Sequence, residues 1–191
     1  MHCRMERVAR LALVGCIVCL VGCASQPGAQ QKAGRLSAPR SSHGGMHGEP
    51  LRGLESALRS RLASTDAVVL ADSGFIRVRV IAAAIFLADA ADLSSAAGEV
   101  LQPLAATLVD SPATSVEVRA YTDDLDSSPR ALALTQQRAD MVALYFTQHG
   151  IATERIHARG EGQAEPVEGN TGPEGRRANR RVEILISALS S

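Results

Sequence analysis

Aromatic residues are scarce in this chain of 191 residues: they make up 3% of it, and tryptophan is absent. Its core must therefore be built mainly from Ala, Val, Leu and Ile. The formal net charge is zero, with 20 basic and 20 acidic residues, so the basic excess typical of nucleic-acid-binding proteins is missing. The length suits one domain with appendages, and we expect no nucleic-acid partner.

Cysteine is absent after residue 23. This excludes a disulfide framework or a cysteine-based zinc site in the rest of the chain. Long apolar runs are missing too, because the run at residues 11–22 is shorter than the roughly 20 residues that span a bilayer. His43 and His47 alone form an incomplete metal site, and we expect no metal and no cofactor.

The apolar run follows a positively charged segment, a combination typical of a signal peptide; its arginines are Arg4, Arg7 and Arg10. The run ends in LVGC, residues 20–23, which resembles the bacterial lipoprotein box, in which the cysteine thiol accepts lipid. An earlier LVGC, at residues 13–16, would leave too short an apolar region. We therefore expect a signal peptide over residues 1–22 and acyl chains such as palmitate on Cys23; a plain secretory signal is the alternative.

The segment that begins with the expected lipidation site, residues 23–50, is rich in Gly, Ser, Pro, Gln and Ala. It has almost no large apolar side chain, so we expect a disordered linker that spans roughly 30 Å. Ala24, rather than Asp, follows the cysteine. By resemblance to enterobacterial sorting, this favours a lipid anchor on the periplasmic face of the outer membrane.

A helix and a strand are expected over residues 51–71, ahead of the main domain at 72–191. Four leucines at helical spacing indicate a packing helix, with a partner-binding helix as the alternative: Leu51, Leu54, Leu58 and Leu62. Strands at 67–71 and 75–81 flank a turn. In the second strand, Arg77 and Arg79 alternate with apolar residues and should lie on its polar face.

Helices and strands alternate in the main domain. A helix at 93–112 contains Pro103 and has Ser94 or Ser95 as its expected cap. After a strand at 115–121 comes the strongest helix, 129–149, with Ser128 as cap, Pro129 in its first turn and Leu132 on its apolar face. Short strands follow at 154–159 and 180–187. This alternation predicts an α/β sandwich with helices packed on one sheet face.

Two charged residues are placed to form a site. Asp123 follows the strand at 115–121, at the carboxyl edge where α/β sheets bind ligands. Arg138 lies in the next helix, and its side chain leans back toward the loop that holds Asp123. A carboxylate accepts an ammonium and a guanidinium grips a carboxylate, so the pair could hold an amino-acid-like head group. A structural ion pair is an equally open alternative.

Residues 75–187 resemble the OmpA-like peptidoglycan-binding domain, the C-terminal module of OmpA, Pal and MotB. The resemblance lies in four motifs in order: AIFLADAADLSSAA at 84–97, YTD with ALALTQQRA at 121–139, RIHARGEGQAEP at 155–166, and GNTGPEGRRANRRVEI at 169–184. It implies an α+β sandwich of β-α-β-α-β type, with helices packed on one face of a mixed sheet.

The resemblance also implies a ligand, the diaminopimelate residue of the peptidoglycan stem peptide. Asp123 would take its amine and Arg138 its carboxylate, aided by backbone amides near Thr122 and Leu134. Tyr121 and Arg180 are possible borders of the groove. The chain departs from the family pattern at four positions: Tyr121 replaces His, Asp126 replaces Gly, Arg130 replaces an aromatic residue, and Ala131 replaces Asn.

The resemblance implies an outer-membrane lipoprotein that tethers the membrane to peptidoglycan noncovalently. The alternative is a subunit of an envelope-spanning machine, such as a type IV or type VI secretion apparatus or a motility complex, acting through protein contacts. No catalytic Ser/His/Asp set, zinc triad or acid pair is discernible in the sequence, so we expect a binding protein and not an enzyme.

Overall fold

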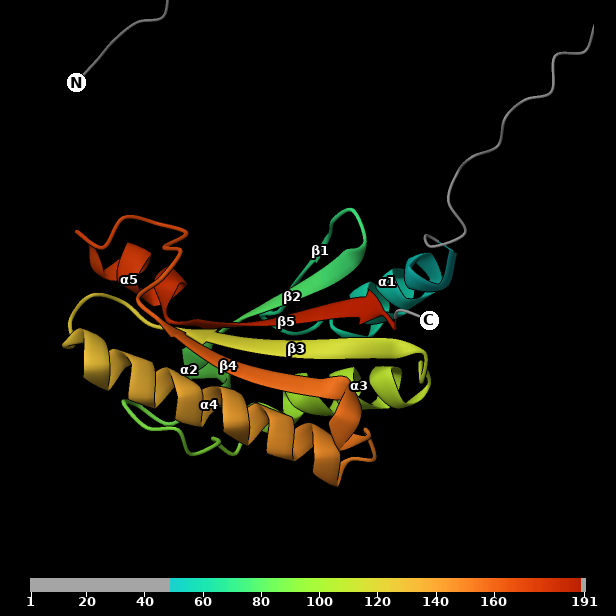
Figure 1. Ribbon diagram of the computed structural model, residues 1–191. Helices are drawn as coiled ribbons and strands as arrows, with labels where there is room; N and C mark the ends of the chain where they lie inside the picture. Colours follow the sequence, from blue (N-terminus) through green and yellow to red (C-terminus); the bar gives the residue numbers. More distant parts are fainter. Residues whose placement is uncertain (1–48, 190–191) are drawn as a thin grey trace, which may run out of the picture. The chain divides into compact units, whose positions relative to one another are not determined.

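The computed structural model describes residues 49–189 (Figure 1). The expected signal peptide, Cys23, the two linker histidines and nearly all of the expected linker lie outside these residues. Within them, no helix is both long and apolar enough to cross a membrane. The elements in chain order are α1 Glu49–Arg61, β1 Val68–Ala71, β2 Phe75–Ile81, α2 Ala82–Ile85, α3 Ala97–Val109, β3 Thr114–Tyr121, α4 Ser128–Gln148, a 3-10 turn Thr153–Arg155, β4 Ile156–Gly162, α5 Pro173–Asn179 and β5 Arg181–Ala188.

The five strands form one mixed sheet in the order β1-β2-β5-β3-β4. β3 and β4 are parallel, because α4 connects them as a crossover, and all other neighbours are antiparallel. Figure 1 shows α3 and α4 together on one side of this sheet. The predicted fold, helices packed on one face of a mixed sheet, is confirmed.

The core is aliphatic, as the composition predicts. Alternate residues of the three central strands are buried beneath the helices; they include Ile76, Val78, Val80, Val116, Val118, Val182, Ile184 and Ile186. The four leucines of the first helical segment are buried as well, so the predicted packing helix is confirmed. Residues 51–71 therefore share their sheet and core with the rest of the described chain.

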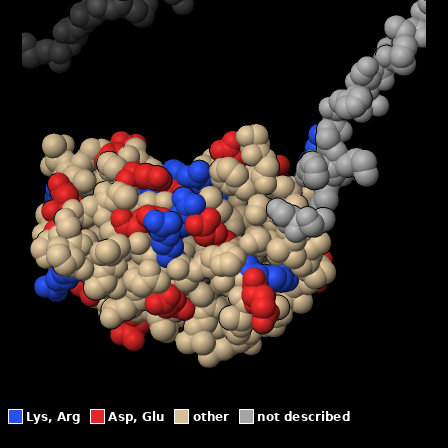
Figure 2. Space-filling view, viewed as in Figure 1, with Lys and Arg blue, Asp and Glu red and all other residues tan. Residues whose placement is uncertain are grey.

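The opposite face of the sheet is charged. Glu183 on β5 is 1% exposed, and its carboxylate accepts bonds from Arg77 at 2.8 Å, Arg79 at 3.0 Å and Arg181 at 2.9 Å. Burial opposes its ionisation, but the three guanidiniums outweigh burial and lower its pKa. The predicted polar position of Arg77 and Arg79 is confirmed. On the surface seen in Figure 2, basic and acidic side chains are interleaved.

Two predicted helix starts are wrong. The cap of α4 is Ser127 and not Ser128, although Pro129 lies in the first turn as predicted. Helix α3 begins after Ala96 and continues through Pro103. Ser94 does not cap it, because its Oγ is buried without a partner among the described residues; its N–H donates to the carbonyl of Ile85 and ties the preceding loop to α2. Ser95 also precedes the observed cap.

The apolar face of α4 differs from the prediction at Leu132, which is 52% exposed. The buried face holds Ala131, Thr135 and Arg138 instead. Thr135 lies inside because its hydroxyl accepts a hydrogen bond from the N–H of Gly162 at 3.0 Å. A polar residue on this face thus completes the hydrogen bonding of β4, a role that hydrophobic periodicity does not reveal.

Helix α4 and edge strand β4 are in direct backbone contact at Gly160. A Cβ at this position would lie 2.3 Å from the backbone nitrogen of Gln136. The N–H of Gly160 donates to Oε1 of Gln136 at 2.9 Å. Side chains of α4 therefore cover outward N–H groups of the edge strand, which protects that edge and fixes where α4 lies along it.

Substitution Gly160→Ala should destabilise the fold by about 1–3 kcal/mol, because the added methyl must push α4 away from β4. Denaturant unfolding of the whole chain measures this. Gly98→Ala in α3 is the matched control, since a Cβ there meets nothing within 4 Å. The control should change stability by less than about 1 kcal/mol, and equal effects of both substitutions would contradict the proposed contact.

Candidate functional site

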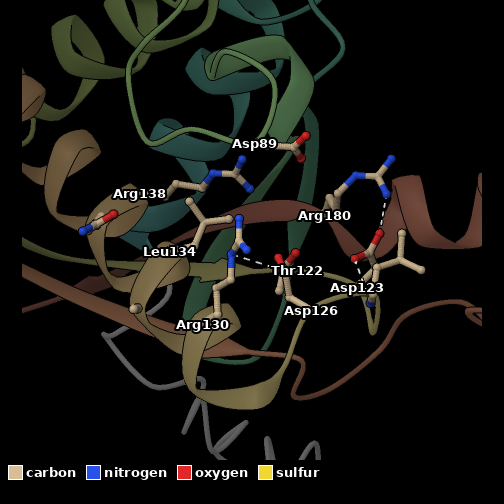
Figure 3. A pocket seen from close by; sticks show the side chains of 11 residues that line it. Asp89, Thr122, Asp123, Asp126, Arg130, Leu134, Arg138 and Arg180 are labelled. Atoms are coloured by element: carbon tan, nitrogen blue, oxygen red, sulfur yellow. Dashed lines mark hydrogen bonds and ion pairs between the residues drawn. The ribbon is translucent and has the colours of Figure 1, made fainter.

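A pocket of about 480 Å³ lies at the carboxyl end of β3 (Figure 3). Its walls come from the loop before α3, the loop between β3 and α4, the first turns of α4, and Arg180 at the end of α5. Five of the predicted site residues line it together: Thr122, Asp123, Leu134, Arg138 and Arg180. The predicted position of Asp123 at the strand end is confirmed.

Asp123 is 5% exposed and is paired with Arg180. Its Oδ2 accepts a short bond from the guanidinium of Arg180, and Oδ1 accepts the N–H of Leu125 at 3.4 Å. Arg138 lines the same pocket but does not share this ion pair. The carboxylate therefore has an internal cation as partner, and that cation is not Arg138.

Arg138 is 4% exposed, yet no carboxylate among residues 51–189 pairs with it. Its Nε donates to the carbonyl of Ala90 at 2.8 Å, and the guanidinium carbon lies 5.2 Å from the centre of the Phe86 ring. Nη1 is buried without a hydrogen-bond partner in this part of the chain. Such a group is costly to keep, so its place in a pocket points to a missing acceptor.

Burial lowers the pKa of Arg138, because the charged form loses its hydration. Asp89 partly offsets this, Arg180 adds repulsion, and Asp123 contributes a smaller attraction. In Figure 3, Arg138 and Arg180 lie on opposite sides of the pocket, with Asp89 between them at its top. An arginine keeps its proton in this setting, so the site presents a poorly solvated cation.

The loop between α2 and α3 supports Arg138 from above. Asp89 adopts a positive φ of 52°, a conformation that costs energy for any residue other than glycine. The next residue, Ala90, offers its carbonyl to Arg138. Asp89 is absent from the predicted site, because nothing in the sequence separates it from an ordinary exposed loop aspartate.

Arg180 is positioned by the end of α5. The neighbouring Asn179 accepts hydrogen bonds from the N–H groups of Val167 at 2.8 Å and Glu168 at 3.1 Å. Its side-chain amide donates to the carbonyl of Glu168 at 2.7 Å. This closed network holds the preceding loop against α5 and fixes the backbone from which Arg180 reaches Asp123.

Tyr121 lies outside the pocket lining. It is buried on the charged side of the sheet, where the guanidinium of Arg181 lies 3.8 Å from its ring centre and its hydroxyl is 3.4 Å from Glu165. The cause is strand alternation, which sends Tyr121 and its neighbour Thr122 to opposite sides.

Thr122 and Leu134 do line the pocket, but their backbone N–H groups are not available to a ligand. The N–H of Thr122 donates to the carbonyl of Gly162 at 2.8 Å. Leu134 is the seventh residue of α4, beyond the first turn in which helical N–H groups lack intrahelical partners. These two residues therefore shape the wall, and any free amides must belong to their neighbours.

The arrangement can hold a molecule that carries a cation and an anion close together. Asp123 offers a carboxylate for an ammonium, and Arg138 offers an unused N–H for a carboxylate. The described residues contain no cluster of three His, Cys, Asp or Glu side chains that could hold a metal ion.

Residues 85–180, which are 96 of the 191, match the family model described as the OmpA family. A probable lipoprotein, YiaD of Escherichia coli (strain K12), is 34% identical over 135 residues, covering 71% of this chain and 62% of that protein. The peptidoglycan-binding protein ArfA of Mycobacterium tuberculosis is 38% identical over 99 residues, covering 52% of this chain and 30% of that protein. The chain belongs to the OmpA family, as the motifs predict.

Solved structures agree with this family. A putative MotB-like protein from Desulfovibrio vulgaris matches with a TM-score of 0.68 and 26% identity, covering 75% of this chain and 94% of that one. The cell wall anchor of the type VI secretion system of Pseudomonas aeruginosa matches with a TM-score of 0.61 and 27% identity, covering 69% and 97%. The chain spans less than two thirds of the length of YiaD and of ArfA, so these similarities concern a part of each relative.

Arg138→Met should change the free energy of unfolding by no more than about 1 kcal/mol, because the lost bonds are balanced by relief of an unsatisfied buried cation. Denaturant unfolding measures this. The matched control is Arg155→Met, which removes bonds to the carbonyls of Leu108, Ser111 and Thr114 and should cost about 2–4 kcal/mol. A larger loss at Arg138 than at Arg155 would assign Arg138 to the scaffold.

Proposed function

We propose that this protein binds peptidoglycan noncovalently through the diaminopimelate residue of the stem peptide. The free end of that residue carries an amine and a carboxylate on one carbon, the chemistry for which the pocket is equipped. The observation that carries the proposal is the buried guanidinium of Arg138 with an unused N–H. The name of ArfA, a peptidoglycan-binding relative, supports it.

In the proposed complex the ligand ammonium approaches Asp123, whose carboxylate is held by Arg180 when the pocket is empty. The ligand carboxylate accepts from Arg138. Both charged contacts form in a nearly water-free setting, because each protein partner is at most 5% exposed. Charge-assisted bonds are strongest under these conditions, and the ligand must supply both charges together.

The departures from the family pattern leave this chemistry possible. Asp126 brings an extra negative charge to the pocket, but Arg130 lies 3.4 Å from it and neutralises it locally. Ala131 is completely buried on the inner face of α4, where it has no side-chain polar group to offer. The loss of Asn at this position therefore removes one potential bond and adds no obstruction.

We further propose that acyl chains on Cys23 hold the protein on the periplasmic face of the outer membrane. The LVGC motif and the name of YiaD, a probable lipoprotein, support this. Stable anchoring takes more than one acyl chain, which bacterial lipoproteins provide. The linker at 23–50 would then let the folded domain reach the wall, so the protein would tether one layer to the other.

A second candidate is a subunit of an envelope-spanning machine that acts through protein contacts. Leu125 supports it, because this leucine lines the pocket and is 71% exposed. An exposed leucine in the wall of a pocket offers an apolar contact to a partner protein. The fold shared with a type VI secretion cell wall anchor also supports this candidate.

The two site charges should both be required for binding to peptidoglycan. Asp123→Asn and Arg138→Met should each weaken co-sedimentation of the detergent-purified chain with sacculi at least tenfold, because each leaves a buried ligand charge without its partner. The amount of protein in the pellet is measured against sacculus concentration.

Matched controls are Asp124→Asn and Arg159→Met, which replace exposed residues outside the pocket lining. These should pellet like the parent protein. If the parent protein stays in solution, the proposal is wrong and the surface around Leu125 becomes the leading candidate for a protein contact. Loss of binding in the controls as well would indicate nonspecific charge attraction.

A further inference from the structure

A second pocket of about 510 Å³ adjoins the first. Three charged residues line both pockets: Asp89, Arg138 and Arg180. A ligand that occupies the first pocket therefore has its next chemical group within reach of the second. Nothing in the family match or in the predicted site assigns an occupant to this space.

The floor of the second pocket is small and apolar. It is formed by five apolar residues: Ala82, Ala83, Phe86, Leu87 and Ala88. Alanines leave room that larger residues would fill. Phe86 is 3% exposed and packs beneath the guanidinium of Arg138, so the floor is fixed by the core.

Two arginines line the second pocket beside its apolar residues. Arg138 borders it with a side chain that is 4% exposed and with Nη1 unpartnered in the described chain. Arg180 borders it with a guanidinium whose bond to Asp123 leaves other N–H groups unused. A small apolar group that carries a carboxylate matches this combination better than an acidic or bulky side chain does.

We infer that the second pocket binds the D-alanine that follows diaminopimelate in a tetrapeptide stem. This inference rests on the proposed function. The methyl group lies against the alanines and Phe86, and the terminal carboxylate accepts from Arg180, because Arg138 holds the diaminopimelate carboxylate in the proposed complex. D-alanine is attached to the end of diaminopimelate opposite its free amine and carboxylate, so the length of the diaminopimelate side chain lets the two groups occupy adjoining pockets. The residue on the other side of diaminopimelate, D-glutamate, has no methyl side chain to place against the apolar residues and fits less well.

The protein should therefore bind a tetrapeptide stem about tenfold more tightly than the tripeptide that ends at diaminopimelate. Calorimetric titration of the detergent-purified chain with both synthetic peptides measures this. Both peptides end in a carboxylate, but only the tetrapeptide brings it into the second pocket together with a methyl group. Burial of that methyl group and the better-placed charged contact are sufficient for a difference of this size.

Ala83→Leu fills the second pocket from an exposed position in α2 and should abolish the tetrapeptide preference while the tripeptide affinity stays within about twofold. Ala106→Leu, at an exposed position of α3 outside both pockets, is the control and should keep the preference.

Equal affinity of the parent protein for both peptides would overturn the inference and leave the proposed function standing. An equal loss for both peptides in Ala83→Leu would also overturn it. If neither peptide binds the parent protein, the proposed function fails and the inference fails with it.

Discussion

The contact of α4 with β4 is the constraint on which the rest of the site depends. Because Gly160 has no side chain, the helix backbone approaches the strand directly, and Gln136 and Thr135 bond its outward N–H groups. This contact fixes the helix along the sheet. Arg138 follows within one turn, so its position over the strand ends is a consequence of strand–helix packing and not of any ion pair.

Charges are used in two different ways in this fold. On the open face of the sheet, Glu183 is surrounded by three arginines and its bonding is satisfied within the protein. Arg181 on that face also has an unpartnered Nη1, but it is paired with Glu183, whereas Arg138 at the pocket is buried to a similar extent and has no carboxylate partner in the described part of the chain. The first arrangement stabilises the scaffold. In the second, the desolvation cost of the buried guanidinium is not offset within the protein, and a ligand carboxylate that accepts its N–H would offset it.

Much of this organisation could be predicted from sequence. Periodicity indicated the leucines of α1 and the alternating strands, and the position of Asp123 at a strand end predicted that it shares a site with Arg138. Local sequence rules gave wrong predictions where hydrogen bonds between distant elements determine a residue's position. Ser94 bonds the loop before α3 to α2 and does not cap α3, and Thr135 lies on the buried face of α4 where Leu132 was predicted. The Asp123–Arg180 pair joins residues 57 positions apart, and Asp89 depends on a backbone conformation, so neither had a local signal.

The central claim is that Arg138 stays unpaired in order to receive a ligand carboxylate. Calorimetric titration of the whole chain with two tripeptide stems tests it most directly, one ending in meso-diaminopimelate and one in L-lysine, which has the amine but lacks the second carboxylate. The account predicts that the lysine stem binds at least about thirtyfold more weakly. Equal affinities would contradict it, because the ammonium contact at Asp123 alone would then explain binding.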